Sequence, residues 1–89
     1  MSEGHEPGQE IGRVSHYFGQ LSVAAVSLAA PLAIGDRIHL KGHTTDFVQE
    51  VRSMQIEHAP VERANPGDDV AIGVDDQVRE HDLIYRETP

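Results

Sequence analysis

Turn signals recur along the chain at intervals of about eight to twelve residues, and this spacing limits the possible folds more than any other feature. They include Gly19-Gln20, Ala29-Ala30-Pro31 and Gly35-Asp36, and the strongest of them is Asn65-Pro66-Gly67-Asp68-Asp69. The stretches between them are short, and several are rich in β-branched residues and alternate between apolar and polar side chains. This pattern predicts an all-β domain, either a sandwich or a barrel.

A chain of 89 residues makes one domain and has little material with which to cover sheet edges. Closing the sheet removes those edges, so we expect a small closed β-barrel of about six to seven strands. The polar start of the chain, residues 1–10, predicts a disordered N-terminal tail. Residues 11–89 are then a single barrel domain.

The stretch Ile34–Gly42 predicts a loop closing at Gly35-Asp36 and then a short strand. Alternation places Ile38 and Leu40 on the core face and the intervening basic side chains on the outer face. A second clean alternation, Val70-Ala71-Ile72-Gly73-Val74, predicts that Val70, Ile72 and Val74 also point into the core.

The stretch Phe47–His58 changes phase halfway, which predicts a bulge or a sharp bend near Arg52-Ser53. The apolar run Leu21–Ile34 has enough alanine to allow a helix, but its valines and Pro31 favour strand and turn. It is shorter than the roughly 20 apolar residues that span a bilayer. No membrane association is expected.

The net charge is -8, with 15 acids against 7 Lys and Arg. Binding to free duplex DNA requires clustered basic residues that displace counterions from phosphates, so the composition argues against it. The chain has no cysteine, which fits a reducing cytoplasm. A cytoplasmic location is therefore expected.

The order of the segments IGDRIHLKG, MQIEH, ANPGDDVAIGV and VREHDLIY resembles the second domain of translational GTPases such as elongation factor Tu. It looks closest to small stand-alone translation elongation factor-like proteins. Similar barrels also close the C-terminus of a family of collagenase-like peptidases. The resemblance implies a closed barrel whose turns fall at Gly35-Asp36, Pro66-Gly67 and His81-Asp82. Where this family usually has glycine the chain has His81, so a histidine at positive φ is expected.

The chain contains no GxxxxGK[ST] loop, so the resemblance brings no GTP site and no GTP hydrolysis. The implied role is a non-catalytic module that binds a protein or a ribosome-associated ribonucleoprotein partner, with RNA binding. The alternative is an accessory barrel that works with a collagenase-like peptidase. A third possibility, an enzymatic barrel, requires a pocket with converging ionisable groups.

Six histidines invite a metal hypothesis, in which His39, His43 and His58 are the most plausible ligands. Their spacing does not match the ligand spacing of tetrahedral sites, so no metal centre and no cofactor are expected. His16 and His58 fall in phase with apolar residues, which predicts partial burial. The pairs Asp68-Asp69 and Asp75-Asp76 lie at turns, where aspartates bond their own backbone, and no catalytic residue is predicted.

The remaining candidate is a row of basic or potentially basic side chains on the outer face of the 34–42 strand and near it. We predict a partner-binding patch, and its expected residues are Arg37, His39, Lys41, His43 and Arg52. The alternative is an ordinary solvated strand face. The expected partner is an acidic protein surface or a confined stretch of RNA backbone.

Overall fold

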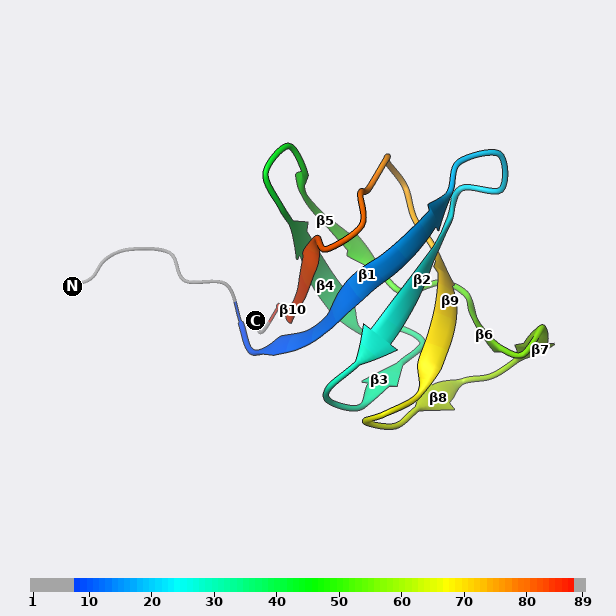
Figure 1. Cartoon of the computed structure of the whole chain (residues 1–89). Coiled ribbons are helices and arrows are strands. Elements are labelled where there is room, and N and C mark those ends of the chain that lie inside the picture. Colours follow the sequence, from blue (N-terminus) through cyan, green and yellow to red (C-terminus); the bar gives the residue numbers. More distant parts are fainter. Residues whose placement is uncertain (1–7, 88–89) are drawn as a thin grey trace.

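The computed structural model describes residues 8–87 and shows only strands and connections within them. The two longest strands, β1 with nine residues and β2 with six, form a hairpin that reaches away from the rest of the domain (Figure 1). The strands are β1 (Glu10–Phe18), β2 (Val23–Leu28), β3 (Leu32–Ala33), β4 (Arg37–Lys41), β5 (Asp46–Glu50), β6 (Met54–Ile56), β7 (Ala59–Pro60), β8 (Arg63–Ala64), β9 (Asp69–Gly73) and β10 (Leu83–Arg86). The predicted all-β class is confirmed. Of the predicted tail, residues 1–7 lie outside the described residues, and Glu10 already belongs to β1.

Eight strands form one curled sheet in the order β5-β4-β10-β1-β2-β9-β6-β7, and β3 pairs with β8 in a separate ribbon. The sheet is a half-barrel, because no ladder joins its two end strands, β5 and β7. The prediction of a closed barrel is therefore wrong. Both ends are protected in other ways: β5 carries charged residues at its two ends and β7 contains Pro60, and charge and proline both discourage pairing with another strand.

The chain crosses from one end of the sheet order to the other between β5 and β6, and the sheet stays open at this crossing. β5 pairs with β4, whereas β6 pairs with β9, and the three residues between them, 51–53, pair with neither. The predicted sharp bend is confirmed at this position. Val51 is fully buried in the bend, and its amide donates to the Asp36 carbonyl at 2.8 Å.

The gap between β5 and β9 is bridged by a single side chain. The Gln49 amide nitrogen donates to the Gly73 carbonyl at 2.9 Å, and its oxygen accepts from the Asp75 amide at 2.7 Å. Gln49 is only 4% exposed. A buried side-chain amide is stable when both its nitrogen and its oxygen have hydrogen-bond partners. Gln49 therefore links β5 to β9 and the residues after it, where a closed barrel has ladder hydrogen bonds.

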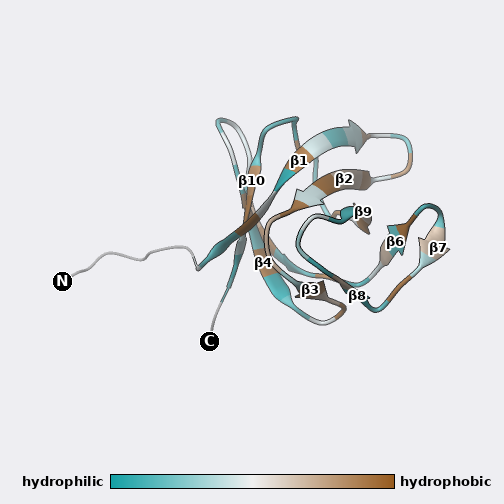
Figure 2. Cartoon of the chain, turned by 60° about the horizontal axis from the view of Figure 1, so that its bottom comes forward, coloured by the Kyte–Doolittle hydropathy of each residue, from teal (hydrophilic) through white to brown (hydrophobic). Residues whose placement is uncertain are grey.

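The core lies on the inner face of the curled sheet, and Figure 2 shows hydrophobic segments on strands of both sheets. The predicted inward residues are buried: Ile38 and Leu40 on β4, and Val70, Ile72 and Val74 on and after β9. The turn at Gly19-Gln20 joins β1 to β2, which pair antiparallel as a hairpin.

The β1–β2 ladder contains an irregularity that alternation did not anticipate. Its register shifts between Val14 and His16. Up to Val14 the apolar residues face the core, but beyond the shift Tyr17 packs against the core while His16 and Phe18 are exposed. One extra residue reverses the facing of everything that follows, so the predicted burial of His16 is wrong.

The three turns on which the family resemblance rested are present. Gly35 and Gly67 have φ values of 94° and 92°, and His81 has a φ of 77°. The predicted positive φ at His81 is confirmed. This turn is held by buried Asp82, whose carboxylate accepts from the Arg79 amide at 2.8 Å.

Candidate functional site

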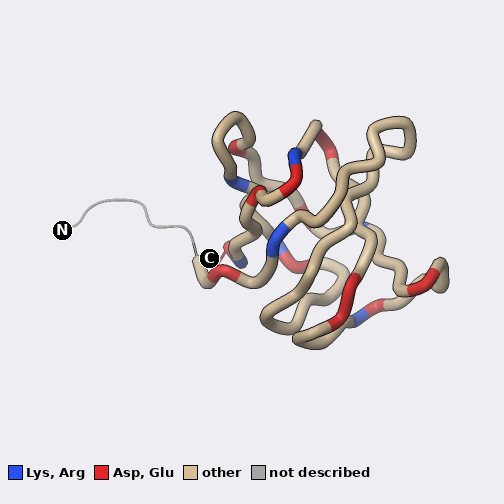
Figure 3. The backbone as a smooth tube through the Cα atoms, in the orientation of Figure 1, with Lys and Arg blue, Asp and Glu red and all other residues tan. Residues whose placement is uncertain are grey.

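The predicted basic row is not a continuous positive patch. Lys41 Nζ lies 3.5 Å from Asp46 Oδ2, and Arg52 forms an ion pair with Asp75 beyond the end of β9. Arg37 and His43 are exposed. Figure 3 shows basic and acidic segments interleaved around this part of the fold. Lys41 and Arg52 thus each have an acidic neighbour within the domain. The role of the row in partner binding stays a prediction.

His39 departs from the expected exposure of the row, because the residue is only 9% exposed. Its ring lies between two carboxylates: Nε2 is 2.5 Å from Asp46 Oδ1 and Nδ1 is 3.5 Å from Glu87 Oε2. The ring of Tyr85 on the neighbouring strand lies 6.5 Å away, centroid to centroid. The expectation of an exposed His39 is wrong, because the side chains of Asp46, Glu87 and Tyr85 lie around its ring.

The electrostatics of this cluster act mainly on Asp46. The hydrogen bond with His39 and, next, the charge of Lys41 lower the pKa of the Asp46 carboxyl below its ordinary value of 3.8. The carboxylate therefore stays ionised at neutral pH and offsets local positive charge. This cluster brings the start of β5 close to Glu87, the residue after β10.

Residues 8–87 contain no group of three metal-ligating side chains. One aspartate of each pair behaves as a turn residue: Asp68 Oδ2 accepts from the Asn65 amide at 2.8 Å, and Asp76 Oδ1 accepts from the Gln77 amide at 2.7 Å. The interpretation as turn residues is confirmed for these two, whereas Asp69 begins β9 and Asp75 forms an ion pair with Arg52. His58 is exposed, so its predicted partial burial is wrong.

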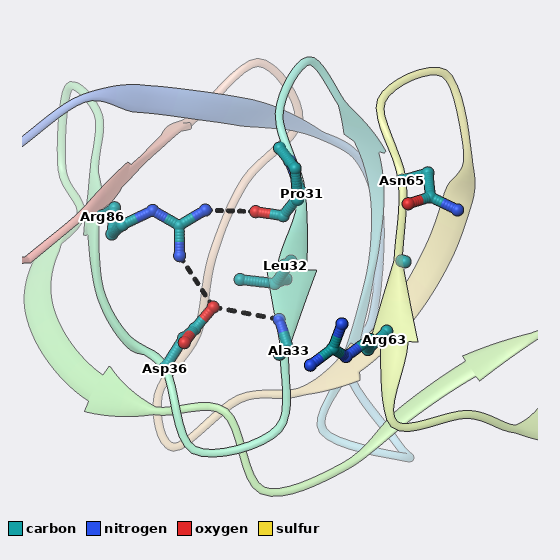
Figure 4. Close-up of a pocket in the computed structure, with 8 residues that line it drawn as sticks. Pro31, Leu32, Ala33, Asp36, Arg63, Asn65 and Arg86 are labelled. Carbon is teal, nitrogen blue, oxygen red and sulfur yellow. Dashed lines mark hydrogen bonds and ion pairs between the residues drawn. The ribbon is translucent and has the colours of Figure 1, made fainter.

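A small hollow of about 130 Å³ lies between the β3–β8 ribbon and β10 (Figure 4). Arg86 reaches across it, donating to Asp36 Oδ2 at 2.7 Å and to the carbonyl of Pro31. Asp36 in turn accepts from the Ala33 amide at 2.9 Å. Arg86 is already engaged by these partners, so we interpret this arrangement as a brace that fastens the ribbon to the large sheet.

A larger hollow of about 390 Å³ lies on the outer face of the large sheet, and we call it the outer groove. Its floor consists of small or short side chains in cross-strand register, with Val23 opposite Gly73 and Ala25, at its edge, opposite Ala71. Phe18 and Leu21 of the β1–β2 hairpin form one wall; Ser53, Gln55 and His58 form the other. The main hollow has no Asp, Glu, Lys or Arg in its lining.

Large apolar side chains are exposed at this groove, with Phe18 43% and Leu21 70% exposed. From Val14 to the end of β2 the hairpin that carries them has no Lys, Arg, Asp or Glu, and its tip is tan in Figure 3. Simple alternation from Val14 turns Phe18 inward, whereas the register shift in β1 turns it outward, so the sequence pattern does not reveal the groove. One available signal was the uncharged run over residues 14–35, which is unusual in a chain with 25% charged residues.

The comparisons with known proteins point to peptidases. The chain is 46% identical over 77 residues to an uncharacterized protease of Methanocaldococcus jannaschii, covering 85% of this chain and 19% of that protein. It is 36% identical over 78 residues to a collagenase of Porphyromonas gingivalis, covering 85% and 22%. No family model matches. The chain thus spans about a fifth of the length of the curated relatives that it matches.

Among solved structures, the C-terminal domain of a Geobacillus thermoleovorans protein assigned to the U32 peptidases superposes with a TM-score of 0.85. The identity is 19%, and the alignment covers 90% of this chain and 93% of that domain. The chain has the fold of that domain. A selenomethionine variant of the same domain gives a TM-score of 0.83.

These matches overturn the resemblance to translation elongation factor-like proteins, and that expectation is wrong together with its translational and RNA-binding roles. The resemblance rested on turns such as Pro66-Gly67 and His81-Asp82. Such turns are required wherever a short chain curls a sheet tightly, so their spacing indicates the architecture without separating one family from another.

Residues 8–87 contain no helix long and apolar enough to cross a membrane.

Proposed function

We infer that this chain is a non-catalytic accessory domain that works beside the catalytic part of a collagenase-like peptidase of the U32 type. The observation that carries this proposal is the 46% identity with a segment that makes up only 19% of a protease. The fold shared with a U32 C-terminal domain supports the same assignment. The proposal holds whether the accessory domain and the catalytic part belong to one polypeptide or to two separate ones.

The side chains of residues 8–87 support a role without bond cleavage. A hydrolytic site needs a positioned nucleophile or metal with a base within hydrogen-bond reach. The one close pairing of a buried histidine with a carboxylate, His39 with Asp46, has no serine or threonine in hydrogen bond with the ring. The outer groove has histidine and serine in its lining, but Ser53 Oγ accepts from the Gly73 amide at 3.3 Å and makes no hydrogen bond with His58.

A domain exchange tests the proposal. In the Porphyromonas gingivalis collagenase, the segment that matches this chain is either deleted or replaced by this chain, and the cleavage of soluble collagen is measured. We expect the exchanged protein to retain cleavage activity and the deletion to lose most of it. The isolated chain, assayed alone as a control, is expected to cleave nothing.

Two results would contradict the accessory role. One is a folded exchanged protein that is no more active than the deletion. The other is collagen cleavage by the isolated chain that copurifies with it through two independent columns.

A further inference from the structure

We propose that the outer groove binds an extended, proline-rich peptide segment whose side chains are uncharged except for a Lys or Arg at one end. This inference goes beyond the accessory role and does not depend on it, because it concerns what the surface of the isolated domain recognises.

The floor of the groove excludes recognition by strand addition. The floor residues Ala25 and Ala71 are paired with a neighbouring strand on each side, so their backbone groups have no free ladder positions. A ligand there cannot join a ladder and is held through side chains instead. The small floor residues, Ala25, Ala71 and Gly73, allow a peptide backbone to approach closely.

One wall offers the aromatic ring of Phe18, which suits proline. The ring of His16, which lies outside the lining and is hydrogen-bonded to Glu80 at 3.1 Å, supports Phe18 from behind, edge to face with a centroid distance of 4.4 Å. Proline-rich segments are preformed extended helices that dock on aromatic-lined grooves with little loss of entropy. The register shift in β1 is what turns this pair outward.

The opposite wall offers side-chain donors. Gln55 lines the groove, and among the described residues no hydrogen bond engages its amide. Ser53 Oγ accepts a hydrogen bond from the Gly73 amide at 3.3 Å, which leaves its own hydroxyl proton to donate. An extended proline-rich backbone has free carbonyl oxygens and few N–H groups, so it matches a wall that presents donors.

Charge identifies one end of the ligand. A second hollow of about 200 Å³ shares Gln55, His58 and Ala71 with the first and adds Glu57 and Asp69 to its lining. The combined hollow is therefore elongated, neutral at the Leu21 end and acidic at the Asp69 end. A ligand with a cationic side chain at the Asp69 end is complementary to it.

Backbone strain is concentrated at the same place. Four non-glycine residues within residues 8–87 have positive φ, and three of them, Ser22, Glu57 and His58, lie in the two turns that border the groove. Their φ values are 54°, 51° and 69°. Glu57 and His58 are the two central residues of the β6–β7 hairpin, a turn that requires positive φ at both, and this turn places His58 at the groove wall.

The direct test is a binding titration with the 89-residue chain. The probe is a fluorescein-labelled single-chain peptide of eight prolines followed by arginine, and fluorescence anisotropy gives the Kd. A second probe ends in glutamate instead. We expect saturable binding of the first probe and about fivefold weaker binding of the second, because rim charges contribute modestly to affinity.

Paired variants assign the binding to the groove. His58→Gly and His81→Gly each remove a histidine from a positive-φ position that glycine adopts freely, so both variants fold. Only His58→Gly should weaken binding, by about threefold or more. Phe18→Ser is expected to raise the Kd about tenfold, as loss of an aromatic anchor does. Its control is Val48→Ser, which changes an apolar residue that is 38% exposed on β5, away from the groove.

The proposal is overturned if neither probe binds at millimolar concentration, or if the His81→Gly and Val48→Ser variants lose binding as strongly as their partners. It is also overturned if sedimentation shows a dimer that Phe18→Ser converts to monomer, since a second copy of the chain then occupies the groove. All these results are independent of the domain exchange, which measures cleavage by the peptidase.

Discussion

Two regions lie on the outside of the same sheet: the basic row on β4 and the outer groove over β2 and β9. They differ in whether their side chains have interaction partners within the domain. In the row, Lys41 and His39 share the carboxylate of Asp46. In the main hollow of the groove, no lining residue carries a fixed charge, and large apolar groups face solvent. The charged region is thus largely satisfied within the domain, while the groove is not. A surface whose groups lack internal partners is the better candidate for binding.

The largest expected effect comes from the frame that both regions share. Ile72 lies on the inner face of β9 and is 1% exposed, between Ala71 and Gly73 of the groove floor. Ile72→Ala should lower the free energy of unfolding by about 2–5 kcal/mol, because it removes buried methyl groups and leaves a cavity. Urea denaturation followed by circular dichroism measures the change.

The matched control is Leu21→Ala at the groove rim, where the side chain is 70% exposed. It should change the same free energy by less than about 0.5 kcal/mol. Equal effects of the two substitutions would show that the two faces of the sheet are assigned the wrong way round.

The next largest loss of stability is expected at Gln49, whose side chain links β5 to β9 and the residues after it. Gln49→Ala leaves the Gly73 carbonyl and the Asp75 amide without their side-chain partner. The expected loss is about 2–4 kcal/mol, since a buried group without a partner costs roughly 1–3 kcal/mol. The control Gln55→Ala, in the exposed wall of the groove, should be nearly neutral. A neutral Gln49→Ala would mean that the sheet needs no bridge at its open side.

A smaller effect is confined to the row and depends on pH. The pKa of Asp46 is lowered in the folded chain by the His39 hydrogen bond and then by Lys41. A depressed carboxyl pKa contributes stability that is fully present above its unfolded value of 3.8 and is lost as the pH falls through the lower folded value. Asp46→Asn should therefore lower the melting temperature at pH 6, and its difference from the wild type should shrink at about pH 2.

Thermal melts at several pH values check this prediction, with Asp69→Asn as the control for an exposed aspartate that makes no ion pair within residues 8–87. A gap between wild type and Asp46→Asn that stays constant with pH would show that the cluster stabilises the fold without charge.

The smallest effect on stability is expected for the double substitution Arg37→Ser and Lys41→Ser. Both side chains are exposed, so the melting temperature should change by about 2 °C or less. If the row does dock a partner, the same variant weakens the capture of an acidic protein and reduces its dependence on salt. Unchanged capture with unchanged salt dependence would leave the row as a solvated strand face.

Local patterns in the sequence determined much of the fold. Turn residues with special φ requirements, such as Gly67 and His81, placed the turns, and alternation on β4 and β9 identified Ile38, Leu40 and Ile72 as core residues. These features depend on residues close together in the chain, where side-chain period and backbone preference act directly. The change of phase near Arg52-Ser53 likewise located the bend before β6.

Only the tertiary structure decided which side chains on the outside of the sheet have partners within the domain and which face solvent. The burial of His39 depends on Asp46 of β5 and on Glu87, which follows β10. The open side of the sheet depends on one amide, Gln49, which meets residues 24 and 26 positions away. The outer groove depends on a single register shift in β1, which turns Phe18 from the core to solvent. Such pairings arise between distant segments once the sheet curls, and a periodic pattern carries no information about which side chain lies opposite which.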